Sequence, residues 1–224
     1  MRDLIITENI TLDGVIEDPT GDDGFSRGGW FTEIGEDDRQ AWAEVEAGEA
    51  MAAEALLIGR RTYHWLIARG WRSRTGPWAD RLTAMTKYVV SSALGDPDWE
   101  NTTVLAGDPV DEVTKLKERL DGEILVNGSG RLARTLIEHD LVDEVRLMVY
   151  PFVLGDGERL FPATTDPRGM RLVESRTVGT GLTCAPTARA PPRRIGARCP
   201  RTSRRRPRNR DVPCCACVPT SGRA

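Results

Sequence analysis

The sequence predicts an α/β domain built around a central, mostly parallel sheet. Three observations support this prediction. Short apolar runs rich in β-branched residues alternate with stretches of helical period between residues 3 and 183. Several of these runs end at glycine, aspartate or asparagine, where a strand gives way to a turn or a helix. No segment repeats at a fixed interval, so a repeat architecture is not expected.

The individual elements follow from these patterns in chain order. The best-marked helix has Asp108 as its N-cap and Pro109 in its first turn, and it stops at Gly122. A loop rich in glycine and aspartate, residues 18–29, separates the first strand from the first helix. We expect the other helices at 36–54, 60–68 and 129–139, and strands at 4–12, 55–58, 87–91, 102–105, 123–126, 143–150 and 170–178.

Charge divides the chain into two unlike parts. Residues 1–183 hold 20 basic and 33 acidic residues, a net charge of −13, whereas residues 184–224 hold 11 arginines and one acid. An acidic body argues against nucleic acid as the main partner, because phosphate backbones bind to basic surfaces. No cysteine precedes Cys184, and no apolar run approaches the roughly 18 residues of a membrane span. We therefore expect a soluble, cytoplasmic protein with no nucleic-acid or membrane partner.

Two segments share a strand, a glycine turn and an arginine at the start of a helix. They are LLIGRRTYHW (residues 56–65) and ILVNGSGRLARTL (residues 124–136). The first amides of a helix lack partners within it and, with the helix dipole, attract anions. Two such sites in one sheet suit a dinucleotide with its pyrophosphate. Alternatively, the glycines only turn the chain and the arginines are solvated. The sequence lacks both GxxxxGK[ST] and a GxGxxG after its first strand.

These segments, together with ITLDGVI (10–16), KYVVSS (87–92) and the long block 124–161, resemble the dihydrofolate reductase-like superfamily. The sequence is most similar to the reductase (C-terminal) domain of the bacterial bifunctional riboflavin biosynthesis deaminase-reductase and to its stand-alone relatives. The resemblance covers residues 3–183 and implies a three-layer fold with helices on both faces of the sheet. It also implies a homodimer and NADPH as the cofactor.

The resemblance also implies where NADPH would bind. Its adenosine 2′-phosphate would meet Ser91 and Ser92, helped by Arg60 or Arg61, and this extra phosphate favours NADPH over NADH. The first strand would pass the nicotinamide at Glu8, Asn9, Thr11 and Asp13. The residues expected around the pyrophosphate are Gly59, Arg60, Arg61, Thr62, Asn127, Gly128, Ser129, Gly130, Arg131 and Leu132.

Two features of the family cannot be assigned from the residues. Folate-reducing members take their proton donor from early in the helix after the long loop, and here Asp37, Asp38, Glu44 and Glu46 all compete for that role. Such members also carry a cis bond between two glycines at the turn that is Gly128-Ser129 here. A cis bond without proline costs roughly 3 kcal/mol, and serine makes its transfer to this chain doubtful.

The implied chemistry is hydride transfer to the carbon of a C=N or C=O bond in a pyrimidine- or pteridine-like substrate. Our first expectation is reduction of 5-amino-6-(5-phosphoribosylamino)uracil in riboflavin biosynthesis, and our second is reduction of dihydrofolate. A nucleotide-binding or regulatory dimer without turnover is the alternative of a different class. Two histidines are too few for a histidine-built metal site, so no metal is expected.

The tail, residues 184–224, has too few large apolar residues to form a core, so we expect disorder. Its abrupt change in composition favours a reading-frame artefact of a GC-rich gene. Nucleic-acid binding by Arg204-Arg205-Arg206 or zinc binding by Cys214-Cys215-Ala216-Cys217 are weaker alternatives. Because Cys184-Ala185-Pro186 follows residue 183, we expect the domain to end there and to lack the final strand of its relatives.

Overall fold

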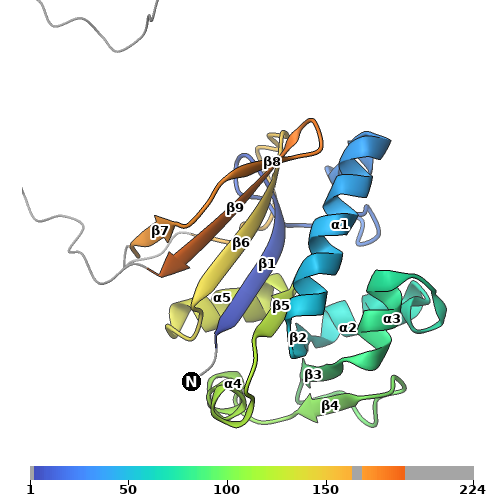
Figure 1. The fold of residues 1–224 in the computed structure, drawn as a ribbon, viewed down its shortest axis with the longest axis vertical. Coiled ribbons are helices and arrows are strands. Elements are labelled where there is room, and N and C mark those ends of the chain that lie inside the picture. The colour runs from blue at the N-terminus through green and yellow to red at the C-terminus, as the bar shows by residue number, and fades with distance from the viewer. Residues whose placement is uncertain (1–2, 163–167, 190–224) are drawn as a thin grey trace, which may run out of the picture. The chain divides into compact units, whose positions relative to one another are not determined.

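Strands and helices alternate along the part of the chain that the computed structural model describes, residues 3–162 and 168–189 (Figure 1). The strands are β1 (Leu4–Thr11), β2 (Ala55–Gly59), β3 (Thr86–Val90), β4 (Thr102–Leu105), β5 (Ile124–Asn127), β6 (Glu144–Tyr150), β7 (Met170–Leu172), β8 (Arg176–Val178) and β9 (Leu182–Arg189). The helices are α1 (Glu36–Ala52), α2 (Arg60–Ala68), α3 (Pro77–Ala84), α4 (Pro109–Arg119) and α5 (Gly130–Glu138), with short 3-10 turns η1 (Trp30–Glu33) and η2 (Trp71–Ser73).

The strands form one sheet of order β4-β3-β2-β5-β1-β6-β9-β7, in which β8 also pairs with β9. All neighbours from β4 to β6 are parallel, and β9 joins β6 in the antiparallel direction. The predicted mostly parallel sheet is therefore confirmed. Because parallel strands end at the same edge, the carboxyl ends of β3, β2, β5 and β1 lie in sequence along one rim.

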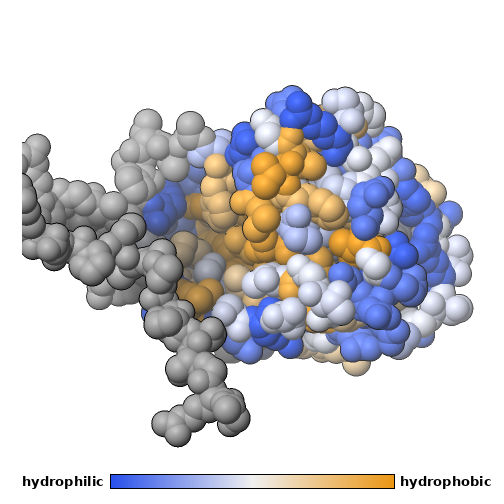
Figure 2. Space-filling view, turned by 90° about the horizontal axis from the view of Figure 1, so that it is seen from above, coloured by the Kyte–Doolittle hydropathy of each residue, from blue (hydrophilic) through white to orange (hydrophobic). Residues whose placement is uncertain are grey.

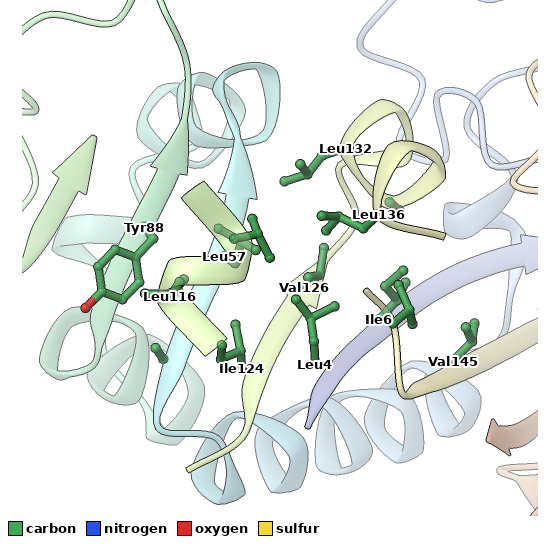
Figure 3. Packing of buried hydrophobic residues seen from close by; sticks show 14 of the residues in the cluster. Leu4, Ile6, Leu57, Tyr88, Leu116, Ile124, Val126, Leu132, Leu136 and Val145 are labelled. Carbon is green, nitrogen blue, oxygen red and sulfur yellow. The ribbon is translucent and has the colours of Figure 1, made fainter. Parts of the chain in front are cut away.

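Helices cover both faces of this sheet, as the three-layer prediction requires. Strand residues such as Leu57 and Val126 pack with Leu116 of α4 and Leu136 of α5 on one face (Figure 3). On the other face, Leu56 and other residues of the same strands pack against α2, α3 and the end of α1. Nearly every side chain of β2 is buried, as expected for a central parallel strand.

Local sequence signals explain the elements that were predicted well. The carboxylate of Asp108 accepts hydrogen bonds from the amides of Val110 (2.9 Å) and Asp111 (3.2 Å), which caps α4 as predicted. Helix α3 was missed because it buries only Ala79 and Leu82, too few residues to produce a periodic pattern. The single strand predicted at 170–178 is two strands, β7 and β8, which pair with different ends of β9.

The last strand corrects the predicted end of the domain. We expected Cys184-Ala185-Pro186 to end the sheet at residue 183, but β9 continues to Arg189 and pairs with β6 as far as Glu144. Pro186 fits because β8 pairs with β9 only up to Cys184 and β7 only from Thr187, so the missing N–H falls between these two partners. Cys184, which we had placed in the tail, is buried in the core.

The remaining predictions for the tail fall on residues 190–224, which lie outside the described residues. The disorder, the reading-frame origin and the two alternative binding roles therefore stay predictions.

We predict that ending the chain after Thr183 abolishes cooperative thermal unfolding. Only two of the eight β9 residues would remain, and β6 would lose its antiparallel neighbour. Each buried backbone group left unpaired costs about 1–3 kcal/mol, so several together exceed the stability of a typical domain. Circular dichroism melting would compare this chain with one that ends after Arg189. Equal melting temperatures would show that β9 contributes nothing.

Candidate functional site

The two glycine turns singled out in the sequence meet at the rim of the sheet. Strands β2 and β5 are parallel neighbours with Leu57 opposite Val126, so the turns that follow them lie side by side. The Ser129 hydroxyl joins these turns: it accepts a hydrogen bond from the Gly59 amide at 2.9 Å and donates to Thr62 Oγ1 at 2.9 Å. The two predicted phosphate-binding segments therefore form one junction.

Ser129 occupies the left-handed region, with φ of 62°, directly after Gly128 with φ of 56°. A non-glycine residue rarely adopts this conformation, and here the two hydrogen bonds of its hydroxyl hold it in place. Among the described residues no peptide bond is cis, so the bond between Gly128 and Ser129 is trans. The doubt raised by serine at this position was justified.

The backbone amides at the starts of α2 and α5 form the next part of the junction. Neither helix has a side-chain N-cap among the described residues, so their first amides are available to an anion. A Cβ placed on Gly59 would be 3.8 Å from Ser129, and one on Gly128 would be 4.0 Å from Thr62. Both distances are ordinary van der Waals contacts, so at either position a side chain would fill the space next to the junction that glycine leaves.

Gly130 serves a different purpose. A Cβ at Gly130 would overlap Ile16 Cδ1, the far end of a flexible side chain, so any other residue here would displace Ile16 from the start of α5. The family-like segment ITLDGVI therefore covers part of the second turn with its own side chain.

The residues predicted for the adenosine 2′-phosphate lie at the neighbouring strand end. Gly59 is paired with Val90 in β3, so Ser91 and Ser92 follow at the same level of the rim. Ser91 Oγ accepts the amides of Ala93 (3.1 Å) and Leu94 (2.9 Å) and so caps a turn, whereas Ser92 is exposed. Arg60 is exposed as well, and Arg61 pairs with Asp23 of the long loop.

The residues predicted beside the nicotinamide do not form one cluster. Successive side chains of β1 alternate between the faces of the sheet, so Asn9 faces α1 and Glu8 faces the α5 side. Asn9 Oδ1 accepts a hydrogen bond from Trp42 Nε1 of α1 at 3.0 Å. Glu8 is buried, its Oε2 has no hydrogen-bond partner in the described part of the chain, and desolvation raises its pKa to about 8.

Thr11 and Asp13 hold a turn together. Thr11 Oγ1 donates to Asp13 Oδ1 at 2.7 Å, and Asp13 also accepts the amides of Leu154 (3.1 Å) and Gly155 (2.7 Å). The bond from Thr11 is the largest cause that lowers the pKa of Asp13 to about 2. Asp13 thus links the end of β1 to the segment after β6, and a direct contact with the nicotinamide stays a prediction.

The structure separates the four acids that compete for the role of proton donor. Asp37 and Glu44 are exposed. Asp38 accepts the backbone amides of Thr180 and Gly181, and the Thr180 amide is the main cause of its lowered pKa. Of the four, Glu46 is the one that faces the junction. It is buried, and its Oε2 accepts a hydrogen bond from Asn127 Nδ2 at 2.9 Å, where β5 ends.

Burial keeps Glu46 neutral at ordinary pH. Desolvation is the largest cause that raises its pKa from 4.5 to about 8, and the nearby charge of Glu49 adds to this shift. Hydrogen bonds from Asn127 and Thr7 oppose the shift only partly. The sequence did contain a signal, because Trp42, Glu46 and Ala50 follow at helical spacing and place a carboxyl group within the face of α1 that packs on the sheet.

A model of the family described as the RibD C-terminal domain matches residues 2–184. This chain belongs to that family. The resemblance found in the sequence is thereby confirmed, and with it the dihydrofolate reductase-like fold.

Three known proteins are similar to this chain in sequence or in structure. The uncharacterized protein YyaP of Bacillus subtilis (strain 168) is 35% identical over 97 residues, which cover 43% of this chain and 50% of YyaP. A putative riboflavin biosynthesis protein from Shewanella sp. PV-4 has a TM-score of 0.62 and 18% identity over 84% of this chain and 99% of that one. The diaminohydroxyphosphoribosylaminopyrimidine deaminase/5-amino-6-(5-phosphoribosylamino)uracil reductase of Thermotoga maritima has a TM-score of 0.55 and 14% identity over 84% of this chain and 57% of that one.

Residues 3–162 and 168–189 hold neither a metal-binding cluster nor a membrane-spanning helix. No group of three or more His, Cys, Asp or Glu side chains is arranged to hold a metal ion. No helix in these residues combines the length and apolar character needed to span a membrane.

We predict that Glu46→Gln makes the protein more stable than the wild type at high pH. Because the pKa of Glu46 is raised in the folded state, its contribution to the free energy of unfolding is complete below about pH 4.5 and is lost as the pH rises towards 8. Glutamine stays neutral, so urea unfolding at about pH 9 should give a free energy higher by on the order of a few kcal/mol, with little difference near pH 4. The exposed Glu44→Gln is the control. A parallel pH dependence in Glu46→Gln and wild type would contradict this account.

Proposed function

We propose that this protein is an NADPH-dependent reductase that transfers hydride to a C=N or C=O carbon of a pyrimidine- or pteridine-like substrate. The junction of two uncapped helix starts at one sheet rim is the observation that supports this most strongly. Membership of the RibD C-terminal domain family adds independent support for a reductase.

The residues of the junction fit a phosphorylated dinucleotide. The uncapped amides at the starts of α2 and α5 would hold its pyrophosphate, and Gly59 and Gly128, which place no side chain beside the junction, would let it approach the backbone. Arg60 at the start of α2 and Ser92 after the neighbouring strand β3 are both exposed and would hold the 2′-phosphate. When bound, NADPH supplies the hydride, and the protein contributes binding and orientation.

Glu46 is our candidate for the group that holds the proton needed at the substrate heteroatom. With a pKa raised to about 8 it is protonated at neutral pH, as a general acid must be. Asn127 fixes the carboxyl group from the end of β5, beside the turn that would bind the coenzyme.

For the substrate we propose 5-amino-6-(5-phosphoribosylamino)uracil. The Thermotoga maritima protein of similar fold carries this reductase activity in its name. Dihydrofolate is the second candidate substrate, and a nucleotide-binding protein without turnover is the alternative of a different class.

We also propose that the protein forms a homodimer. Figure 2 shows apolar side chains gathered on the face seen from above, towards which β1 and β6 run. Leu12 and Val153, which follow these two strands, are 63% and 70% exposed. Exposed apolar side chains of this kind often mark a contact between subunits.

NADPH oxidation tests the proposed function directly. We expect the full chain to consume NADPH with the phosphoribosylaminouracil substrate and more slowly with dihydrofolate. Glu46→Gln should lower kcat by roughly 10²–10⁴-fold, because it removes the proton, while Glu44→Gln should behave as wild type. If no pyrimidine or pteridine causes oxidation although NADPH binds, the protein is a binder and not a reductase.

The coenzyme preference tests the position of the 2′-phosphate. Arg60→Ala and Ser92→Ala should weaken NADPH binding, for the arginine by roughly tenfold or more, because a charge-assisted hydrogen bond contributes about 1.5–3 kcal/mol. NADH, which lacks that phosphate, should bind the variants and the wild type alike. Isothermal titration measures both, with the exposed Arg72→Ala as control. Equal losses for the two coenzymes would place the phosphate elsewhere.

A further inference from the structure

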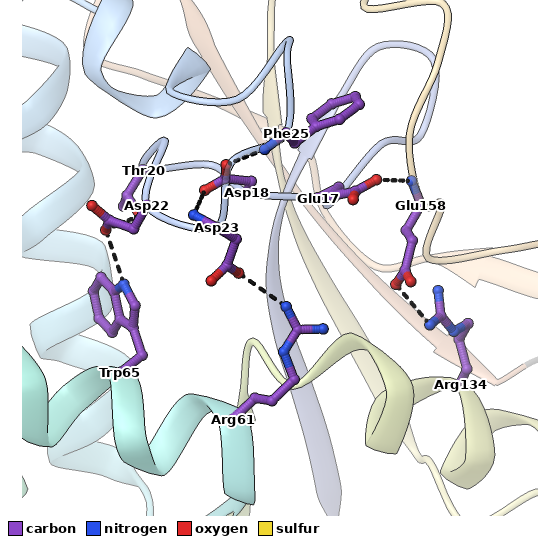
Figure 4. Close-up of polar contacts among 10 residues, drawn as sticks. All are labelled: Glu17, Asp18, Thr20, Asp22, Asp23, Phe25, Arg61, Trp65, Arg134 and Glu158. Atoms are coloured by element: carbon purple, nitrogen blue, oxygen red, sulfur yellow. Dashed lines mark hydrogen bonds and ion pairs between the residues drawn. The ribbon is translucent and has the colours of Figure 1, made fainter.

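Helix α2 and the residue that caps its end, Arg69, carry a row of hydrogen-bond donors on one side. Arg61, Trp65 and Arg69 follow at intervals of four residues, so their side chains lie one above another on the same face, the Arg61/Trp65/Arg69 stripe. Two carboxylates of the 18–29 loop contact this stripe (Figure 4). Asp22 accepts a hydrogen bond from Trp65 Nε1 at 3.2 Å and pairs with Arg69, and Asp23 Oδ2 lies 3.0 Å from Arg61 Nη2.

The loop is folded so that it presents these two carboxylates to α2. Asp18 is buried, and its carboxylate accepts the amides of Asp23 (3.0 Å) and Phe25 (3.1 Å). Its carbonyl oxygen accepts the amides of Gly21 and Gly29, which closes the loop on itself. Asp22 and Asp23 therefore stand at the tip of an ordered turn and not on a random coil.

The groups around Asp22 match those that bind phosphate oxygens. It receives the guanidinium of Arg69, the indole N–H of Trp65 and the hydroxyl of Thr20, and the Arg69 bond is the largest cause that lowers its pKa. Guanidinium with neutral hydrogen-bond donors is a common arrangement for phosphate recognition. A carboxylate is the nearest side-chain equivalent of a phosphate oxygen, so Asp22 marks a place suited to an anion.

These contacts are weak enough to be exchanged. The side chains of Arg61 and Asp23 are 75% and 57% exposed, and those of Arg69 and Asp22 are 41% and 34% exposed. Ion pairs at such exposure contribute little to stability, because water and salt screen them. A phosphate group, which carries more charge than a carboxylate, can therefore compete for the same donors.

The stripe starts next to the junction and runs away from it along α2. Arg61 is in the first turn of α2, next to Thr62, which contacts Ser129. Arg69 is eight residues further on, roughly 12 Å away at 1.5 Å per residue. A ligand whose other end lies at the junction can reach the stripe along α2.

We infer that the Arg61/Trp65/Arg69 stripe binds a phosphate monoester, for which Asp22 and Asp23 of the 18–29 loop act as internal substitutes. The loop must release the stripe when such a ligand enters. The choice of phosphate rests on the proposed function: because Arg60 and Ser92 are proposed to hold the 2′-phosphate of the coenzyme, the phosphoribosyl phosphate of the substrate is the expected ligand of the stripe. The 2′-phosphate is the alternative that the test separates.

The test is binding of ribose 5-phosphate and of 2′-AMP to the full chain by isothermal titration at constant ionic strength. Asp22→Asn should tighten binding of one of them roughly two- to fivefold, because the competing carboxylate loses its charge. Arg69→Gln should weaken the same ligand roughly tenfold or more. These opposite effects cannot both arise from misfolding. Arg72→Gln, which breaks the similarly exposed pair with Asp98, should change neither affinity.

The two ligands identify the source of the phosphate. A response with ribose 5-phosphate alone assigns the stripe to the substrate, and a response with 2′-AMP alone assigns it to the coenzyme. If Asp22→Asn and Arg69→Gln bind both compounds as the wild type does, the inference is wrong. That outcome leaves the proposed reductase intact, since NADPH oxidation is measured separately.

Discussion

The proposed site depends on the hydrogen bonds of the Ser129 hydroxyl, which join the two turns of the junction. Two parallel strands, β2 and β5, deliver their turns to the same rim, and the Ser129 hydroxyl connects Gly59 with Thr62 across them. To make these hydrogen bonds Ser129 adopts the left-handed backbone conformation, which costs on the order of 1–3 kcal/mol in strained sites. The two hydrogen bonds offset part of that cost and hold the starts of both helices next to each other.

Two buried carboxyl groups near the Ser129 hydrogen bonds lie on opposite faces of the sheet. Glu46 of α1 lies on one face, where Asn127 and Thr7 bond to it, whereas Glu8 of β1 lies on the α5 face with one oxygen unpartnered among the described residues. Burial raises the pKa of both to about 8. Strongly shifted pKa values are frequent at functional sites, and a proton held at neutral pH beside the proposed coenzyme site agrees with that pattern.

The 18–29 loop changes the charge of the proposed site, because two of its carboxylates pair with arginines next to it. The net charge of the body is strongly negative, yet α2 places arginines where anions are expected to bind. Asp22 and Asp23 balance two of these arginines, so the positive charge of α2 is partly neutralised within the protein. In the proposed binding at α2, the phosphate would therefore replace carboxylates that already contact the arginines.

The sequence alone determined the parallel α/β sheet, most element bounds and the two glycine turns, because period, caps and turn residues act over a few neighbouring positions. It also indicated the family. Tertiary structure decided what depends on distant partners. Pro186 continues a strand only because its missing N–H falls between β8 and β7, and Glu46 is selected among four acids only because α1 packs it against Asn127. Arg61 and Arg69 meet Asp23 and Asp22 across 38 and 47 residues of chain, a pairing that local sequence signals do not encode because it arises from how the loop packs on the helix.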